Sequence, residues 1–278
     1  MQIGLRLHDA AKLPIEERLK VVREQGFTCG HLALSKTMPP ELAQIDAMTP
    51  GYAMYLRKVF EKNELDVAVL GCYLNLAIPD EEKLQEIVEK YKAHIRFAAH
   101  LGCGVVGTET GAPNVEYKYE PACHSEEALE LFIERLRPVV EYAEKMGVIF
   151  AIEPVWKHIV CNPVRARKVL DAIHSPNLQI ILDPVNLLDT CNYQDQVKIV
   201  DEAIELLGKD VAVVHIKDYV VEEGRLKSVA AGDGQMNYDS ILKFIKERKP
   251  YVHATLENTV PENAVQAKNF ILDKYNQI

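Results

Sequence analysis

Short apolar, β-branched segments alternate with longer amphipathic segments along the whole chain, and this alternation restricts the fold more than any other feature. Segments such as VIFAIE, LQIILD, VAVVHI and YVHATLE are apolar almost throughout, as expected for parallel strands covered on both faces. The segments between them have the spacing of helices that bury one side. The pattern repeats eight times without a linker, and it predicts a parallel α/β fold.

The predicted elements follow one another in strict order. Strands are expected at residues 2–7, 29–34, 66–72, 104–108, 148–153, 178–183, 211–217 and 251–257. Helices are expected at residues 14–25, 51–63, 80–101, 125–147, 163–173, 194–207, 238–246 and 262–275, with Asp80 and Ser125 as N-caps. Residues 38–50, 111–124 and 220–237 are expected to be irregular loops after strands two, four and seven.

Eight parallel strands can form an open sheet or a closed barrel. The even number of units, the length of 278 residues and the absence of a glycine-rich dinucleotide loop favour the barrel. We therefore predict a single-domain α/β protein, a (β/α)₈ TIM barrel over residues 1–278. The three long loops would lie at the C-terminal end of the strands, where such barrels carry their active sites.

Composition excludes several classes of partner. The formal net charge of −9 argues against a nucleic-acid partner, whose phosphates require a basic surface. The N-terminal segment lacks the pattern of a secretory signal, and no apolar stretch is long enough to span a membrane. The six cysteines are scattered and are expected to be reduced thiols. These features predict a cytoplasmic protein that acts on a small molecule.

Strands five to eight each end in a residue that can bind a metal ion. These residues are Glu153, Asp183, His215 and Glu257. Strand ends converge in a closed barrel, so the four side chains are expected around one point. A single acid at the rim is ordinarily a loop residue or a helix cap, but four in phase at successive strand ends indicate a metal site. Three carboxylates and one imidazole suit Mn²⁺, Mg²⁺ or Co²⁺.

The longer motifs around these residues carry a resemblance to a known family. The motifs are AIEP at 151–154, LDPVN at 182–186, VVHIKD at 213–218, AGDG at 231–234 and TLEN at 255–258. Together they resemble the xylose isomerase-like barrel superfamily, and within it the sugar phosphate isomerase/epimerase branch. The resemblance implies that the four residues bind one divalent metal, most commonly Mn²⁺, and that Glu153 and Glu257 also act as acid and base. It also implies a possible homo-oligomer.

The expected reaction is proton transfer at a carbon next to a carbonyl group. A metal bound by the substrate's oxygens stabilises an enediolate, and two carboxylates on opposite sides exchange the proton. The prediction is a metal-dependent sugar isomerase or epimerase. A lyase or dehydratase acting on an inosose or a modified sugar begins with the same proton abstraction and stays open. An endonuclease for abasic DNA and an inactive sugar-binding barrel are the remaining alternatives.

Other polar residues near the strand ends are candidates for substrate binding. They are His8, Glu109, Trp156, His158, Asn186 and Lys217. Lys217 is expected to neutralise an anionic group of the substrate, and Trp156 to stack on a sugar face. Epimerases of free ketoses in this branch often have histidine where this chain has Asn186, and arginine where it reads HIKDYVV. The substrate contacts of those two residues are therefore not carried over.

Overall fold

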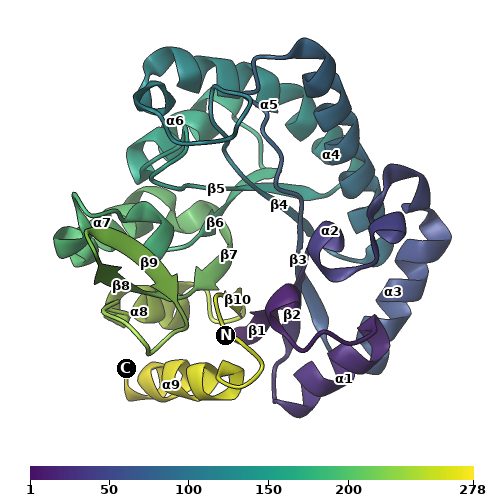
Figure 1. Ribbon diagram of the computed structural model, residues 1–278, viewed down its shortest axis with the longest axis vertical. Coiled ribbons are helices and arrows are strands. Elements are labelled where there is room, and N and C mark those ends of the chain that lie inside the picture. The colour runs from purple at the N-terminus through teal and green to yellow at the C-terminus, as the bar shows by residue number, and fades with distance from the viewer.

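Eight parallel strands close into a barrel in the computed structural model, which describes residues 1–278 (Figure 1). The order around the barrel is β1-β10-β7-β6-β5-β4-β3-β2. The barrel strands are β1 (Gln2–Arg6), β2 (Cys29–Leu32), β3 (Asp66–Gly71), β4 (Val105–Glu109), β5 (Ile149–Glu153), β6 (Leu178–Leu182), β7 (Val211–Ile216) and β10 (His253–Leu256). The predicted (β/α)₈ barrel is confirmed.

The longer helices surround the barrel on its outer side, and the short helix after β2 lies inside this ring (Figure 1). The helices are α1 (Ile15–Glu24), α2 (Leu34–Thr37), α3 (Pro50–Lys62), α4 (Glu81–Leu101), α5 (Glu126–Met146), α6 (Pro163–Ile173), α7 (Gln196–Leu207), α8 (Asp239–Arg248) and α9 (Ala264–Gln277). Short 3-10 helices occupy Leu7–Asp9, Pro40–Ala43, Ile45–Ala47, Pro121–His124, Val185–Leu187, Tyr193–Asp195 and Gly208–Asp210. Asp80 and Ser125 cap α4 and α5 through their side chains, as predicted.

The inside of the barrel is packed rather than hollow in its lower part. Val69, Ala151, Ile181 and Val213 form a buried apolar cluster there. Gly107 on β4 leaves space for it, because a Cβ at this position would lie 2.5 Å from Ile181 Cδ1. Glu153, Asp183 and His215 each come two positions after an apolar residue of this cluster, and therefore on the same side. The packed floor therefore raises the polar side chains to the C-terminal mouth.

Strand register brings polar residues of neighbouring strands side by side. Glu109 pairs with Glu153 across β4 and β5, and Thr255 pairs with His215 across β10 and β7. Side chains of neighbouring parallel strands at the same register lie side by side. This register sets Glu109 beside Glu153, and it leaves Glu257 two residues beyond the pair of Thr255 and His215.

Two sequence predictions of local structure were wrong. The segment 220–237 was expected to be irregular, but it contains most of the antiparallel hairpin β8 (Asp218–Glu222) and β9 (Arg225–Val229). This hairpin lies beside α7 and α8 in Figure 1. The second strand was expected to reach residue 34, but it ends at Leu32 and the short helix α2 begins at Leu34. The six cysteines are free, and no helix has the length and apolar character needed to cross a membrane.

Candidate metal centre and substrate cavity

The four predicted ligands lie at the mouth of the barrel, all of them buried. Glu153 ends β5, Asp183 follows β6, His215 belongs to β7 and Glu257 follows β10. Their exposed fractions are 2%, 0%, 0% and 5% in that order. Acidic side chains are rarely this buried unless a cation or several donors compensate their charge.

Donor atoms of three of these residues converge on one another. His215 Nδ1 lies 3.1 Å from Glu153 Oε1 and 3.3 Å from Glu257 Oε1. Neighbouring ligands of an octahedral ion with 2.1 Å bonds are roughly 3.0 Å apart. Donor atoms of Glu153, Asp183 and His215 also lie within 4.8 Å of one another. The donor set therefore fits a divalent cation held by carboxylate and imidazole groups.

The orientation of Asp183 is fixed by the backbone that follows it. Its Oδ1 accepts hydrogen bonds from the amides of Val185 and Asn186, at 2.9 and 3.1 Å. Oδ2 is left facing the site. The Asn186 side chain donates to Glu153 Oε1 at 2.7 Å and so holds the second carboxylate. Local turn geometry after β6 therefore positions two of the four candidate ligands.

Lys217 stands between two of the buried carboxylates. Its Nζ lies 2.9 Å from Asp183 Oδ2 and 3.1 Å from Glu257 Oε2. Burial on its own would lower the pKa of Lys217, but the charges of Asp183 and Glu257 outweigh burial and raise it. The ammonium is therefore charged at neutral pH. The sequence predicted that Lys217 neutralises an anionic substrate group, whereas the structure pairs it with these protein carboxylates.

The electrostatic environment of Glu257 favours its ionised form. Arg6 Nη1 lies 3.3 Å from Glu257 Oε2, on the same oxygen that Lys217 contacts. Burial raises the pKa of Glu257, but Lys217 and His215 together outweigh it, and the pKa falls well below its ordinary value. Burial likewise lowers the pKa of His215, but Glu153 and Glu257 raise it to about 9. A metal at Nδ1 would have to displace this proton.

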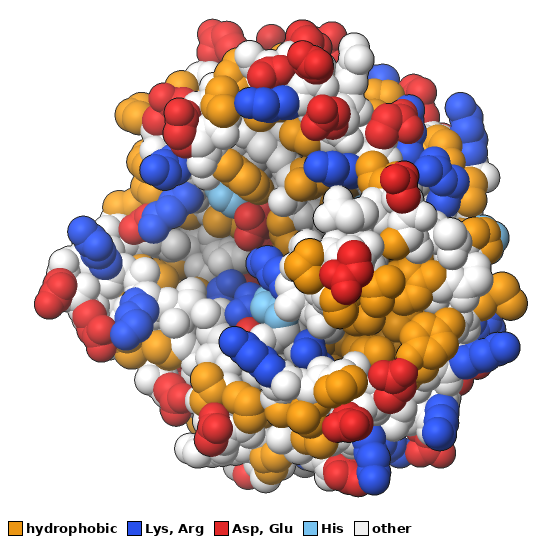
Figure 2. Space-filling model, turned by 45° about the vertical axis from the view of Figure 1, so that its right-hand side comes forward, with side chains coloured by type: hydrophobic (Ala, Val, Ile, Leu, Met, Phe, Trp, Pro, Cys, Tyr) orange, Lys and Arg blue, Asp and Glu red, His pale blue; other side chains and the backbone are white.

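A small polar cavity opens directly above the candidate ligands. It encloses about 140 Å³. Its walls are formed by Arg6, His8, Lys36, Tyr73, Glu109, Glu153, Asn186, Lys217 and Glu257. Figure 2 shows a hollow where basic, acidic and histidine side chains gather. Nine converging residues with only one hydrophobic member are suited to a polar, hydroxyl-rich ligand.

Four of the predicted substrate-binding residues line this cavity, among them His8 and Glu109 as well as Asn186 and Lys217. His8 Nδ1 is buried without a hydrogen-bond partner, and burial together with Arg6 lowers the pKa of His8 to about 4. Glu109 accepts a hydrogen bond from Tyr117 at 3.3 Å. Burial raises the pKa of Glu109. A neutral imidazole and a weakly acidic carboxyl group are both suited to bind sugar hydroxyls.

The other two predicted contacts, Trp156 and His158, lie outside the cavity wall. The Trp156 ring packs against Tyr119 and His124, with ring centroids 5.2 Å away in each case. His158 Nδ1 lies 3.8 Å from Glu109 Oε2. The structure therefore does not bring these two residues to the cavity, because the loops after β4 and β5 pack on each other first.

Sequence reasoning missed two cationic residues of the cavity and gave no role to His31 or to the partly buried Tyr73. Arg6 and Lys36 line the wall although neither was singled out. Arg6 ends β1, and its guanidinium lies 3.3 Å from Glu257 in the mouth of the barrel. His31 and Tyr73 stood near strand ends without an assigned role, yet His31 is fully buried and bonded to the Tyr73 hydroxyl.

Comparisons with known proteins agree with this architecture. The profile of the xylose isomerase-like TIM barrel family matches residues 19–272. A curated relative, 3-oxo-isoapionate decarboxylase of Pectobacterium atrosepticum, is 30% identical over 145 residues. That alignment covers 50% of this chain and 48% of the relative, so it spans about half of each protein.

Two solved structures share the fold at low sequence identity. A D-tagatose 3-epimerase-like protein has a TM-score of 0.76 at 22% identity, with 100% of this chain and 97% of that chain covered. The IOLI protein with a bound zinc atom has a TM-score of 0.76 at 18% identity, with 100% and 99% covered. At these identities the likeness concerns the fold alone.

Proposed function

Because the chain belongs to the xylose isomerase-like TIM barrel family, we propose that it is a divalent-metal-dependent enzyme. The proposed reaction is isomerisation or epimerisation of a sugar or sugar derivative, by proton transfer at a carbon next to a carbonyl. One observation carries the proposal: His215 Nδ1 lies within 3.3 Å of oxygens of both Glu153 and Glu257, at the floor of a polar cavity.

The proposed metal ligands are Glu153, Asp183, His215 and Glu257, with Mn²⁺ as the predicted ion and Mg²⁺ or Co²⁺ as alternatives. A divalent ion held there supplies Lewis-acid stabilisation of negative charge on the oxygens beside the reacting carbon. The residues themselves provide the remaining functions: they orient the substrate and move its proton.

The two glutamates are proposed as acid and base with unequal roles. Glu153 lines the cavity, and among side chains it is contacted by the Asn186 amide and by His215. Glu257 is held in its ionised form by Arg6 and Lys217, and a carboxylate with a lowered pKa is a weak base. We therefore assign the first proton abstraction to Glu153, and to Glu257 metal binding and the second proton transfer.

His8, Glu109 and Asn186 are proposed to bind substrate hydroxyl groups, because all three present polar atoms to the cavity. The cavity is small, so part of a sugar would extend past its rim. Such a substrate would meet His158 and Trp156, which lie on the loop after β5 beside Glu109 and Tyr119. We propose a small-molecule substrate, with no nucleic-acid or membrane partner, in the cytoplasm.

Solvent deuterium exchange tests this proposal. The metal-loaded protein is incubated in D₂O with ketoses, their phosphates and inososes, and deuterium on carbon is followed by NMR. One substrate class is expected to gain deuterium, and Glu153→Gln is expected to abolish the exchange while the fold is retained. Exchange that continues at the wild-type rate in Glu153→Gln would remove this residue from the mechanism. A dehydrated product would identify the lyase alternative.

Decarboxylation of a 3-oxo sugar acid is a second candidate function. The curated relative carries this kind of activity in its name, over half of the chain. The cavity wall also contains three cations, Arg6, Lys36 and Lys217, and Lys36 has no carboxylate partner. A free cation beside the ion site is suited to hold a carboxylate. Release of CO₂ from a 3-oxo acid, without deuterium exchange in ketoses, would favour this candidate over the isomerase.

A further inference from the structure

His31 is a buried imidazole with one unused nitrogen next to the candidate metal centre. It lies on β2 and has an exposed fraction of 0%. Its Nε2 lies 2.9 Å from the Tyr73 hydroxyl, whereas Nδ1 has no hydrogen-bond partner. The nearest carboxylate oxygen, Glu257 Oε1, is 4.0 Å away, beyond hydrogen-bond range. A buried polar atom in a native structure ordinarily has a partner, and this one has none.

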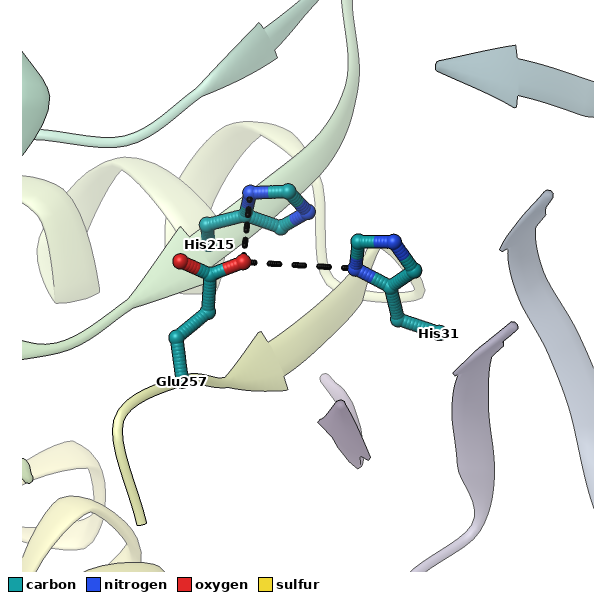
Figure 3. Close-up of side chains that lie close together, drawn as sticks. All are labelled: His31, His215 and Glu257. Carbon is teal, nitrogen blue, oxygen red and sulfur yellow. Dashed lines mark ion pairs between the residues drawn. The ribbon is translucent and has the colours of Figure 1, made fainter. Parts of the chain in front are cut away.

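The unused nitrogen faces a group of metal-binding atoms. Figure 3 shows one oxygen of the Glu257 carboxylate pointing towards both His215 and His31. The two rings are nearly parallel, at 16°, with centroids 5.2 Å apart. One donor atom from each of His31, His215 and Glu257 lies within 4.8 Å of the other two. Two donors of one ion can be at most about 4.2 Å apart, so shifts of a few tenths of an ångström close this group around a cation.

The surroundings of His31 favour a free lone pair on Nδ1. His31 Nδ1 has no hydrogen-bond partner, so a proton on this nitrogen would be buried without an acceptor. The Tyr73 hydroxyl oxygen, 2.9 Å from Nε2, can accept a proton that this nitrogen donates. A neutral imidazole whose Nε2–H donates to the Tyr73 oxygen has its lone pair on Nδ1. Metal-binding histidines commonly donate their second ring N–H to a fixed oxygen in this way.

We infer that His31 Nδ1 is a further ligand of the divalent ion, in addition to the four strand-end residues. This inference rests on the metal centre of the proposed function. The possible ligands form two groups that share His215. One is rich in carboxylates (Glu153, Asp183, His215) and the other contains two imidazoles (His31, His215, Glu257).

The second imidazole changes which ion the site prefers. Carboxylates and water suit Mg²⁺ and Mn²⁺, whereas imidazole suits Zn²⁺ and other late transition metals. A site with His31 as a ligand is therefore expected to bind Zn²⁺ or Co²⁺ far more tightly than Mg²⁺. If His31 only packs against Tyr73 and does not bind the ion, the relative affinities for Zn²⁺ and Mg²⁺ should not depend on its imidazole.

Metal affinities of matched variants test the inference. His31→Gln keeps an amide N–H that can donate to Tyr73 but removes the imidazole. His253→Gln is the control, because His253 begins β10 at the opposite end of the barrel, where it contacts Asp66. Zn²⁺ and Mg²⁺ dissociation constants are measured by competition with a chromophoric chelator. We expect His31→Gln to weaken Zn²⁺ binding at least about tenfold and Mg²⁺ binding less than threefold, with His253→Gln unchanged in both.

Wild-type protein provides a test that does not depend on folding of the variant. Loaded with Cu²⁺, it is examined by electron spin-echo envelope modulation, which counts coordinated imidazoles. Two are expected, and a count of one overturns the inference. Zn²⁺ affinity of His31→Gln within twofold of wild type, or equal losses for Zn²⁺ and Mg²⁺, also overturns it. If the wild type binds neither ion, the proposed function fails together with the inference; if wild type and variant bind Zn²⁺ equally, only the inference fails.

Discussion

Replacement of Lys217 by methionine should destabilise the protein strongly when metal is absent. The ammonium lies 2.9 Å from Asp183 and 3.1 Å from Glu257, and its side chain is only 6% exposed. Methionine has similar volume but no charge, so both carboxylates lose their shared buried cation. Removal of one partner from a buried ion pair costs about 3–5 kcal/mol, because the remaining charge is uncompensated. A loss of this size lowers Tm by roughly 6–20 °C at about 2–4 °C per kcal/mol.

A bound divalent ion should reduce this loss. The ion supplies positive charge to the same carboxylates, so the metal-loaded variant retains the partner that the metal-free variant lacks. The increase in Tm on addition of metal is therefore expected to be larger in Lys217→Met than in the wild type. Differential scanning calorimetry with chelator and with metal measures all four states. Binding of the ion to the folded state raises Tm in both proteins. This contribution is the same for the two proteins only if they bind the metal with equal affinity, so the metal dissociation constants of both are measured in parallel.

Lys20→Met is the matched control for this experiment. Lys20 is exposed and pairs with Glu24 at 3.8 Å within α1. Exposed pairs of this kind contribute about 0–1 kcal/mol, so the control should keep its Tm within a few degrees of wild type. A fall of less than 2 °C in metal-free Lys217→Met, or an equal fall with and without metal, would contradict the assignment of Lys217 as the cation that compensates the carboxylates.

Two further predictions concern stability near the site. Burial lowers the pKa of His158 from 6.5 to about 4, so the unfolded chain binds this proton first. The free energy of unfolding of the wild type should therefore fall as pH decreases from 6.5 towards 4. In urea titrations, His158→Gln should lose up to about 1.4 kcal/mol less per pH unit than the wild type. Equal slopes of unfolding free energy against pH in the two proteins would refute this. Gly111 has φ +77°, and a Cβ there would lie 2.4 Å from Asn75 Oδ1. Gly111→Ala should lower the free energy of unfolding by more than the roughly 1–2 kcal/mol that left-handed backbone strain alone costs. Gly224 has φ +71° and open space around its Cβ position, so Gly224→Ala should show the cost of the strain alone. Equal losses in the two variants would show that the contact with Asn75 is harmless.

The barrel and the positions of the candidate ligands were predictable because both depend on where apolar and polar residues fall along each strand. A buried parallel strand leaves few places for a charged residue, so Glu153 and Glu257 at strand ends were conspicuous. The closed barrel then required neighbouring strand ends to converge. No rotamer had to be known for that conclusion.

The cationic partners were not predictable in the same way. Lys217 was recognised as facing the site, but its long side chain can reach either a substrate or a carboxylate, and only the packed structure decides. Arg6 was overlooked because a single arginine at a strand end is ordinarily solvated. Its contacts with Asp9 and Glu257 depend on the closure of β1 against β10, which is non-local.

The β8–β9 hairpin was missed because its turn sequence differs from the usual one. Two-residue hairpin turns favour Asn-Gly or Asp-Gly, because both central residues adopt positive φ. Here the turn is Glu223-Gly224, with φ of 50° and 71°. Glutamate is an unusual first residue for such a turn, and the alternating strands around it are partly exposed and highly charged. A charged, partly exposed segment with an unusual turn residue is typical of an irregular loop, so the sequence did not indicate a hairpin.

The central claim is that one divalent ion at Glu153, Asp183, His215 and Glu257 supports proton exchange next to a carbonyl. The most direct test follows deuterium incorporation by a single protein sample as isolated, after chelation, and after addition of one equivalent of metal, with metal content measured at each stage. The account predicts about one ion per chain, loss of exchange on chelation and its return with the metal. Exchange at an undiminished rate in the chelated, metal-free protein would contradict it.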